Sequence, residues 1–155
     1  MTTPALDAVT AAGITHRVLS HGPVRSVAEA AAQRGIEVRD VVKTIVVRKA
    51  ADAYVFVLVP GDRVISWPKL RALLGMNRLS LPDAATAREA TGYERGTITP
   101  FGSVRPWPVI ADEVLRGRTV SLGAGAHNVA IELAADDAVR VLAATYADVT
   151  DPDVG

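Results

Sequence analysis

Residues Val41–Val59 read VVKTIVVRKAADAYVFVLV, two runs rich in β-branched side chains on either side of a short connection. Because such side chains are enriched in strands, Val41–Arg48 and Tyr54–Val59 are both predicted to be strands. The short segment Lys49–Ala53 between them is typical of an antiparallel hairpin, and Pro60-Gly61 ends the second strand. The middle of the chain is therefore predicted to be β-structure.

Helices and further strands are predicted on both sides of this hairpin. Ser26 and Glu29 form a capping box, and Gly35 can adopt the left-handed conformation that ends a helix, so a helix is predicted over 26–34. Further helices are predicted over 5–12, 66–74, 82–90 and 135–145, and further strands over 14–19, 108–111, 119–122 and 128–133. Since no regular βαβ repeat appears, the predicted fold class is α/β, with a mixed, mainly antiparallel sheet flanked by helices.

Length and composition predict one domain. The chain has 155 residues, of which 49% are apolar, and this is enough for one continuous core. We expect a single domain over 1–155, with its core at about 5–148 and a frayed tail at 151–155. No apolar run is long enough to cross a membrane and MTTPALDAV does not resemble a signal peptide, so a cytoplasmic protein without membrane contact is expected.

Composition also limits the chemistry. The chain has no cysteine, and its three histidines lack metal-ligand spacing, so neither a metal nor another cofactor is expected. Seventeen basic residues balance 17 acidic ones, so a nucleic acid would have to be bound locally rather than by a large positive field. The sequence carries no indication of an oligomeric state.

Lys43 is the first candidate for a functional residue. Strand alternation places it on the face of Val41, Ile45 and Val47, while Thr44 faces the other way. One interpretation is a lysine whose stem packs on the sheet while its charge reaches water. The other is a cation at the mouth of a pocket, directed at a phosphate or carboxylate.

The loop TGYERGTITPFG, residues 91–102, is the second candidate. Its glycines permit close backbone approach, and exposed amides in such a turn can bind an oxyanion or a carbonyl oxygen. It has neither a Walker motif nor GxGxxG, and a plain connecting loop is the alternative. His127, which ends the Gly-rich turn after Leu122, is the third candidate, against the alternative of a surface histidine. His16 and His21 have no evident partner and are interpreted as structural or solvent-facing.

Three motifs together resemble the YbaK/ProX family, the free-standing relatives of the editing domain inserted in bacterial prolyl-tRNA synthetases. They are VKTIVV at 42–47, TGY followed by GTITPFG at 91–102, and IELA at 131–134. The resemblance covers about residues 5–148. It implies a single α/β domain around a mixed, mainly antiparallel sheet.

The resemblance also implies an activity, namely a trans-editing aminoacyl-tRNA deacylase that hydrolyses the ester joining a wrong amino acid to the 3′-terminal adenosine of a tRNA. Lys43 and Gly96 are then the expected catalytic residues, with Lys43 on the terminal nucleotide and loop amides on the carbonyl oxygen. The expected substrate-binding residues are Thr44, Thr97, Ile98, Thr99, Pro100 and His127. Tyr93–Arg95 are expected on the outer rim. Implied partners are the acceptor end of a misacylated tRNA and an aminoacyl-tRNA synthetase.

The amino acid that is removed stays open at the sequence level. Members that act on cysteinyl-tRNA usually carry an Asp where this chain has Ala130, and an aromatic residue where Leu19 aligns. Substrates like Cys-tRNA(Pro) and like Ala-tRNA(Pro) are therefore both candidates. The alternatives to an editing enzyme are a non-catalytic module that binds an aminoacyl-adenosine or a synthetase, and a hydrolase of another small ester or amide.

Overall fold

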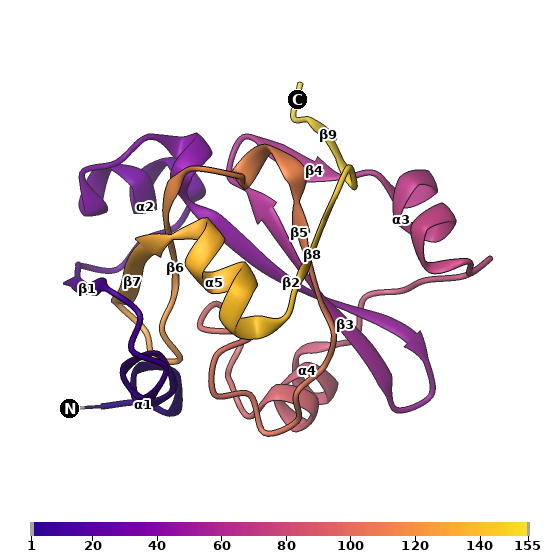
Figure 1. Cartoon of the computed structure of the whole chain (residues 1–155), viewed down its shortest axis with the longest axis horizontal. Helices are drawn as coiled ribbons and strands as arrows, with labels where there is room; N and C mark the ends of the chain where they lie inside the picture. Colours follow the sequence, from indigo (N-terminus) through magenta and orange to yellow (C-terminus); the bar gives the residue numbers. More distant parts are fainter. Residues whose placement is uncertain (1, 155) are drawn as a thin grey trace.

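A computed structural model describes residues 2–154, and its strands form three sheets (Figure 1). The strands are β1 His16–Ser20, β2 Val42–Ala50, β3 Ala53–Pro60, β4 Arg63–Ile65, β5 Val109–Asp112, β6 Thr119–Gly123, β7 Val129–Ala134, β8 Thr145–Ala147 and β9 Thr150–Pro152. The largest sheet has the order β2-β3-β5-β8, with an antiparallel β2–β3 pair and parallel β3–β5 and β5–β8 pairs. The β1-β7-β6 sheet and the β4-β9 pair are antiparallel.

Five α-helices, each of eight residues, cover these sheets. They are α1 Pro4–Ala11, α2 Val27–Arg34, α3 Trp67–Leu74, α4 Ala84–Thr91 and α5 Ala135–Leu142, with the short 3-10 helices η1 Val38–Asp40 and η2 Glu113–Leu115. In Figure 1, α1, α2 and the β1-β7-β6 sheet lie at one end of the molecule and α3 lies at the other. None of the helices within residues 2–154 is long and apolar enough to cross a bilayer.

The hairpin β2–β3 lies between two hydrophobic clusters because its side chains alternate across the sheet. Val42, Val46, Phe56 and Leu58 belong to the cluster that also contains residues of α1 and α5. Val47, Val55, Val57 and Val59 belong to a second cluster with Leu70 of α3. Nearly every residue of β3 is buried, as expected of a strand covered on both faces. At about 1.5–3 kcal/mol for each fully buried aliphatic side chain, the hairpin makes a large apolar contribution to stability.

The structure confirms the predicted fold class and the central hairpin. The helix predicted from the capping box is also confirmed, because Ser26 Oγ accepts from Glu29 N and Gly35 ends α2 in the left-handed conformation. The prediction of a helix over 135–145 was too long. Ala143 adopts a positive φ of 52° after Leu142, and the chain then forms β8.

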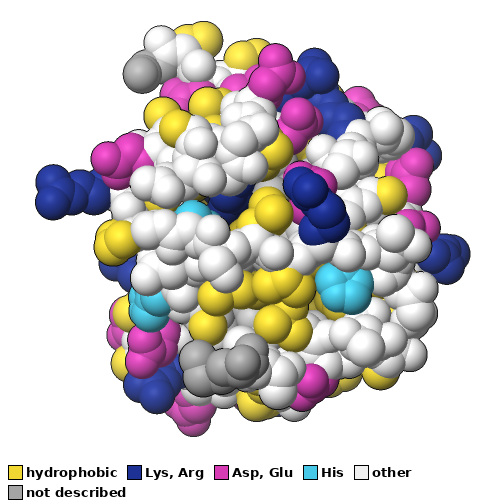
Figure 2. All heavy atoms as spheres, turned by 90° about the vertical axis from the view of Figure 1, so that its left-hand side faces the viewer, with side chains coloured by type: hydrophobic (Ala, Val, Ile, Leu, Met, Phe, Trp, Pro, Cys, Tyr) yellow, Lys and Arg dark blue, Asp and Glu magenta, His cyan; other side chains and the backbone are white. Residues whose placement is uncertain are grey.

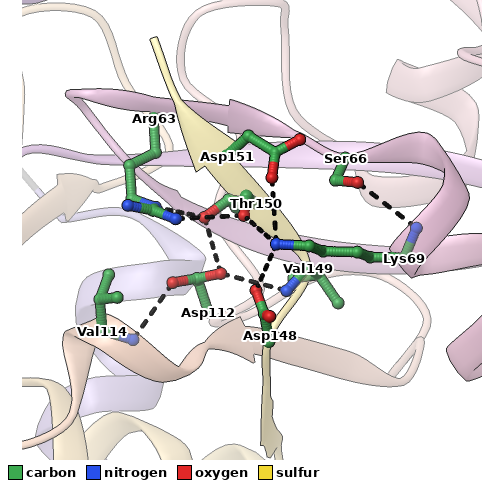
Figure 3. A network of polar contacts seen from close by, with 9 residues as sticks. All are labelled: Arg63, Ser66, Lys69, Asp112, Val114, Asp148, Val149, Thr150 and Asp151. Atoms are coloured by element: carbon green, nitrogen blue, oxygen red, sulfur yellow. Dashed lines mark hydrogen bonds and ion pairs between the residues drawn. The ribbon is translucent and has the colours of Figure 1, made fainter.

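The prediction of a frayed tail at 151–155 was wrong for its first residues, because Thr150–Pro152 forms β9 and pairs with β4. Figure 3 shows the polar network that holds this segment. Asp112, only 1% exposed at the end of β5, accepts hydrogen bonds from Val149 N and Thr150 Oγ1. Arg63 Nε donates to the same hydroxyl oxygen, so β4, β5 and β9 meet at Thr150. Such side-chain contacts across the fold leave no mark in the local sequence pattern.

Candidate active site

A cavity of about 660 Å³ lies between α2, the first half of β2, the start of α4 and the loop that follows α4. Its lining brings together Lys43 and Thr44 of β2 with Gly96 and Ile98 of the loop. The remaining lining residues are Val24, Arg25, Ser26, Val27, Ala30, Arg34, Val41, Val42, Ile45, Val46, Leu81, Pro82, Asp83, Ala84, Ala87, Arg95 and Gly123. Two sequence candidates far apart in the chain therefore line one space.

A second cavity of about 520 Å³ adjoins the first. The two share Val24, Arg34, Gly96 and Gly123 in their linings. The second is otherwise lined by His21, Pro23, Ala126, His127, Asn128 and Val129. Gly96 therefore lies where an apolar cavity with a basic rim meets a smaller cavity that is rich in histidine.

Lys43 lines the first cavity, but its ammonium group is already engaged. Nζ donates a 2.7 Å hydrogen bond to the carbonyl oxygen of Arg63 in β4. Burial lowers the pKa of Lys43, and the nearby carboxylates of Asp153 and Asp62 partly offset that lowering. Ile45 and Val47 pack in the second hydrophobic cluster, so the alternation predicted from the sequence describes this strand correctly. Lys43 therefore lines the cavity while its ammonium group is hydrogen-bonded to the backbone of β4.

The loop presents its backbone at Gly96 and hides most of its side chains. Gly96 has a φ of 88°, a conformation that favours glycine, and it is exposed at the junction of the cavities. Thr97 Oγ1 donates to Glu94 O and Thr99 Oγ1 accepts from Phe101 N, which holds the turn. The buried Thr97, Thr99 and Pro100 line neither cavity, in contrast to their expected role in binding substrate.

Tyr93 does not lie on an outer rim, in contrast to the prediction from the sequence. It is 4% exposed, and its hydroxyl donates to Phe101 O at 2.7 Å, so it forms the base of the loop. Burial raises the pKa of Tyr93 to about 12, so the hydroxyl remains a donor at neutral pH. Glu94 and Arg95 are exposed, as expected of a rim.

His127 lines the second cavity rather than the first. A Cβ atom added at Gly96 would lie 4.0 Å from His127 Cε1, so the imidazole lies next to the loop backbone. Its Nε2 donates to Glu94 Oε2 at 3.1 Å, although the imidazole side chain is 63% exposed. The histidine therefore lies at the mouth of the site, where a carboxylate orients its ring.

Three polar atoms at the site are buried without a hydrogen-bond partner among residues 2–154. They are Thr44 Oγ1 in the first cavity, His21 Nε2 beside the second, and Nε of Arg34, which lines both. His21 Nδ1 lies 2.7 Å from Gly22 O, and a carbonyl can only accept, so Nδ1 carries the proton. In the neutral ring Nε2 then offers a lone pair. His21, which the sequence indicated to be structural or solvent-facing, therefore lines a cavity.

Comparison with known proteins identifies the family of this chain. A sequence profile of the aminoacyl-tRNA editing domain matches residues 21–141, most of the chain. The chain belongs to the aminoacyl-tRNA editing domain family. This match confirms the family resemblance found in the sequence.

The editing domain is similar to part of proline–tRNA ligases and to free-standing proteins. It is 36% identical to the proline–tRNA ligase of Thermosipho melanesiensis over 101 residues, which are 64% of this chain and 18% of the ligase. It is 27% identical over 131 residues to EbsC of Enterococcus faecalis, a candidate Cys-tRNA(Pro)/Cys-tRNA(Cys) deacylase, and this covers 84% of this chain and 78% of EbsC. The chain thus spans less than a fifth of the length of the ligase.

Solved structures agree with this assignment. The editing domain superposes on the hypothetical protein APE2540 with a TM-score of 0.88 at 30% identity, covering 96% of this chain and all of the other. It superposes on a candidate trans-editing enzyme for prolyl-tRNA synthetase with a TM-score of 0.88 at 25% identity, covering 97% and 99% of the two chains. Both neighbours therefore share the fold over nearly the whole described chain.

Gly123 is a site residue of the editing domain that sequence reasoning missed. A Cβ atom there would lie 3.1 Å from Ile98 O and 3.3 Å from Thr97 O, so a side chain at this position would push the loop away from β6 by a few tenths of an ångström. The sequence contains the GAGA run at 123–126, but it does not indicate that the loop at Thr97 and Ile98 packs against Gly123. Ala130 and Leu19, the positions compared with cysteinyl-tRNA deacylases, pair directly across β7 and β1, and Ala130 also pairs with Gly123.

The charges around the first cavity are unbalanced, unlike those of the chain as a whole. Four cationic residues line it, Arg25, Arg34, Lys43 and Arg95. Asp83 is the one acidic residue in this lining, and its carboxylate already caps α4 through Thr86 N. Figure 2 shows Lys and Arg side chains as separate groups, interspersed with Asp and Glu, on the face that includes β1 and β7. Within residues 2–154, no group of three or more His, Asp or Glu side chains could hold a metal ion.

Proposed function

We propose that the chain is a trans-editing aminoacyl-tRNA deacylase that hydrolyses the ester bond of a misacylated tRNA. The observation that carries this proposal is the single cavity lined by Lys43 and Thr44 of β2 and by Gly96 and Ile98 of the loop, in a chain of the editing family. Candidate substrates resemble Cys-tRNA(Pro) or Ala-tRNA(Pro), and the name of EbsC supports the first. A tRNA substrate would place the protein in the cytoplasm, with a synthetase as an additional partner.

In this proposal the protein lowers the barrier mainly by positioning and by stabilising developing charge. Water attacks the ester carbonyl carbon, the bond from that carbon to the ribose oxygen breaks, and the ribose oxygen takes a proton. In this account Gly96 N–H holds the carbonyl oxygen as it gains negative charge, a contribution of about 3–4 kcal/mol per donor in other acyl-transfer enzymes. The neighbouring Thr97 N–H already donates to Glu94 O and shapes the turn. Because an aminoacyl ester is already activated, a free ribose hydroxyl of the substrate is a sufficient relay for the proton.

The side chains around Gly96 have supporting roles in the same proposal. Ile98 and the apolar part of the first cavity receive a small side chain. Thr44 Oγ1, which is buried without a partner in the described chain, offers a hydrogen bond to the substrate. Lys43 holds the adenosine end, and the Arg63 carbonyl fixes the direction of its ammonium group. The buried Thr97, Thr99 and Pro100 shape the loop.

The test is deacylation of a panel of tRNAs charged with Cys, Ala or Ser, by wild type, Lys43→Ala and Lys49→Ala. Lys49 is a matched control because it lies on the same strand, β2, but lines neither cavity at Gly96. We expect wild type and Lys49→Ala to release the amino acid, and Lys43→Ala to lose about 10²-fold or more in kcat/KM, as expected when substrate is misplaced by about 1 Å. A wild type that deacylates none of the panel would refute the enzyme and favour a binding module.

A further inference from the structure

Arg34 lies where the two cavities meet. It is the last residue of α2 and lines both cavities together with Gly96. Its Nη1 donates to Ser121 Oγ of β6 at 2.9 Å, so the side chain spans from the helix to the antiparallel sheet. This contact holds the guanidinium beside the catalytic loop rather than in bulk water.

The charge of Arg34 has no acidic counterpart in the described chain. No carboxylate of residues 2–154 forms an ion pair with it, and its Nε is buried without a hydrogen-bond partner there. Burial lowers the pKa of Arg34, which is the direction expected where no anion compensates for lost hydration. The C-terminal end of α2 favours a cation, but Ser121 supplies only a neutral hydroxyl. Because a partly buried charge is unfavourable without a counter-charge, an anionic ligand would bind favourably to this guanidinium.

Lys43 provides the contrast within the same cavity. Its ammonium group donates to Arg63 O, and the carboxylates of Asp62 and Asp153 act on it. Part of its charge is therefore compensated within the fold. Within residues 2–154, Arg34 has only the hydroxyl of Ser121 as a side-chain partner. Its planar guanidinium can donate two parallel hydrogen bonds to a phosphate.

We propose that Arg34 binds a backbone phosphate of the tRNA acceptor end and thereby positions the acylated terminus across Gly96. The inference rests on the proposed function, because it takes its ligand to be the acceptor end. A phosphate fits better than the side chain of the amino acid, because the cavity rim also carries Arg25 and Arg95 and the substrates proposed above have uncharged side chains. Arg34 is a positioning residue in this account, and it reaches the reaction through the phosphate it holds.

Binding of an uncharged RNA hairpin with a single-stranded 3′-CCA end tests this directly. Fluorescence anisotropy would measure affinity against salt for wild type, Arg34→Gln, Arg34→Met, Arg34→Lys and Arg140→Gln. Arg140 is the matched control, since it also lies in the last turn of an eight-residue helix but pairs with Asp137 and lines neither cavity. Arg34→Met keeps the apolar stem, so one neutral variant remains informative if the other folds poorly.

We expect both neutral variants at position 34 to bind the hairpin about tenfold more weakly or worse. The slope of log affinity against log salt should become less negative by about 0.7, the value for one phosphate contact on a single strand. Arg34→Lys should keep the slope, and Arg140→Gln should match wild type. An unchanged slope in both neutral variants, or no hairpin binding by wild type, would overturn the inference.

Deacylation assays separate this inference from the proposed function. If Arg34 holds a phosphate, the neutral variants should lower kcat/KM by one common factor for every acyl group, because the phosphate is common to all of them. A loss confined to one amino acid would overturn the phosphate assignment and place Arg34 on the acyl group. Hairpin binding with the Arg34-dependent slope but no deacylation of any charged tRNA would refute the enzyme and leave the phosphate contact intact.

Discussion

At the scale of single residues, the cations around the first cavity differ in what surrounds their charge. Lys43 is held by the Arg63 carbonyl, whereas Arg34 meets only a hydroxyl. Lys43 could be recognised as a candidate from the sequence because it interrupts a run of β-branched residues. Arg34 could not, because an arginine at the end of a helix is common. Which of the two retains an uncompensated charge depends on neighbours far away in the chain. The role of a charged residue is therefore read from its partners rather than from its type.

Asp83 is the residue at which we expect a pH effect on stability. Its carboxylate accepts from Thr86 N at 2.8 Å, and this hydrogen bond lowers the pKa of Asp83 below its ordinary value of 3.8. Because the pKa is lower in the folded state, the stabilisation is present above 3.8 and is lost as pH falls through the folded value. We expect Asp83→Asn, which still caps the helix, to reduce stability at neutral pH and to lose less stability on acidification.

Urea unfolding at a series of pH values measures this effect. The difference between wild type and Asp83→Asn should shrink as the pH falls through the folded pKa of Asp83. Direct titration of the carboxyl by NMR should give a pKa below 3.8. A difference that stays constant across the acid range would contradict this role for the charge of Asp83.

At the scale of elements, the loop of residues 91–102 packs closely against β6 and the turn after it. Gly125 N donates to Thr97 O, and a Cβ atom at Gly125 would lie 2.6 Å from Tyr93 Cε1. Gly123 brings β6 to the carbonyl groups of Thr97 and Ile98. The sequence showed two glycine-rich loops separately, and the structure packs them together. The conformation of the 91–102 loop therefore depends on its packing against the second glycine-rich loop.

Gly123→Ala tests this packing without introducing backbone strain, because Gly123 has no positive φ. The added methyl group would lie 3.1 Å from Ile98 O, which is tighter than ordinary contact, so the loop must shift by a few tenths of an ångström. We expect a loss of about 1–3 kcal/mol in the free energy of unfolding. We also expect about a tenfold lower kcat, because small displacements of positioning groups are costly.

Gly22→Ala is the matched control for this substitution. It also lacks a positive φ, and its added Cβ would meet Gln33 Nε2 at an ordinary 3.7 Å. Thermal unfolding and single-turnover deacylation of both variants provide the comparison. Equal activity and stability of Gly123→Ala and wild type would show that the loop does not depend on this contact.

At the scale of the whole molecule, strand β9 near the end of the described chain is linked to the site through β4. β9 pairs with β4, and β4 supplies the Arg63 carbonyl that holds Lys43. Asp112 joins β5 to this pair through Val149 N and Thr150 Oγ1 (Figure 3). A tail expected to fray is therefore part of the framework that orients a cavity residue.

Asp112→Ala should destabilise the protein by about 3 kcal/mol, because it leaves buried donors without their charged acceptor. Urea unfolding measures this loss, and deacylation should fall with it if β4 loosens around Lys43. Asp148→Ala is the control, since this carboxylate has a 53% exposed side chain and pairs with Lys69, which also pairs with Asp151. Solvent-exposed ion pairs of this kind contribute little to stability. An Asp112→Ala variant as stable as the control would contradict the role given to the network.

The sequence alone determined the longer local elements, the fold class and the family. The Val41–Val59 hairpin, the Ser26 cap and the Gly35 stop act through residues close together in the chain, so their patterns predict structure directly. Motif order was enough to recognise the family and to select Lys43 and Gly96 as candidates that line one cavity.

Only the tertiary structure decided which side chains reach the cavities. Strands β4, β8 and β9 have three residues each, too few for a periodic pattern, and they form through contacts such as that between Asp112 and Thr150. Thr97 and Thr99 became supports of the loop, while Arg34 and Gly123 joined the site. The physical reason is that burial, charge compensation and close backbone approach depend on neighbours distant in sequence, and local propensity does not encode them.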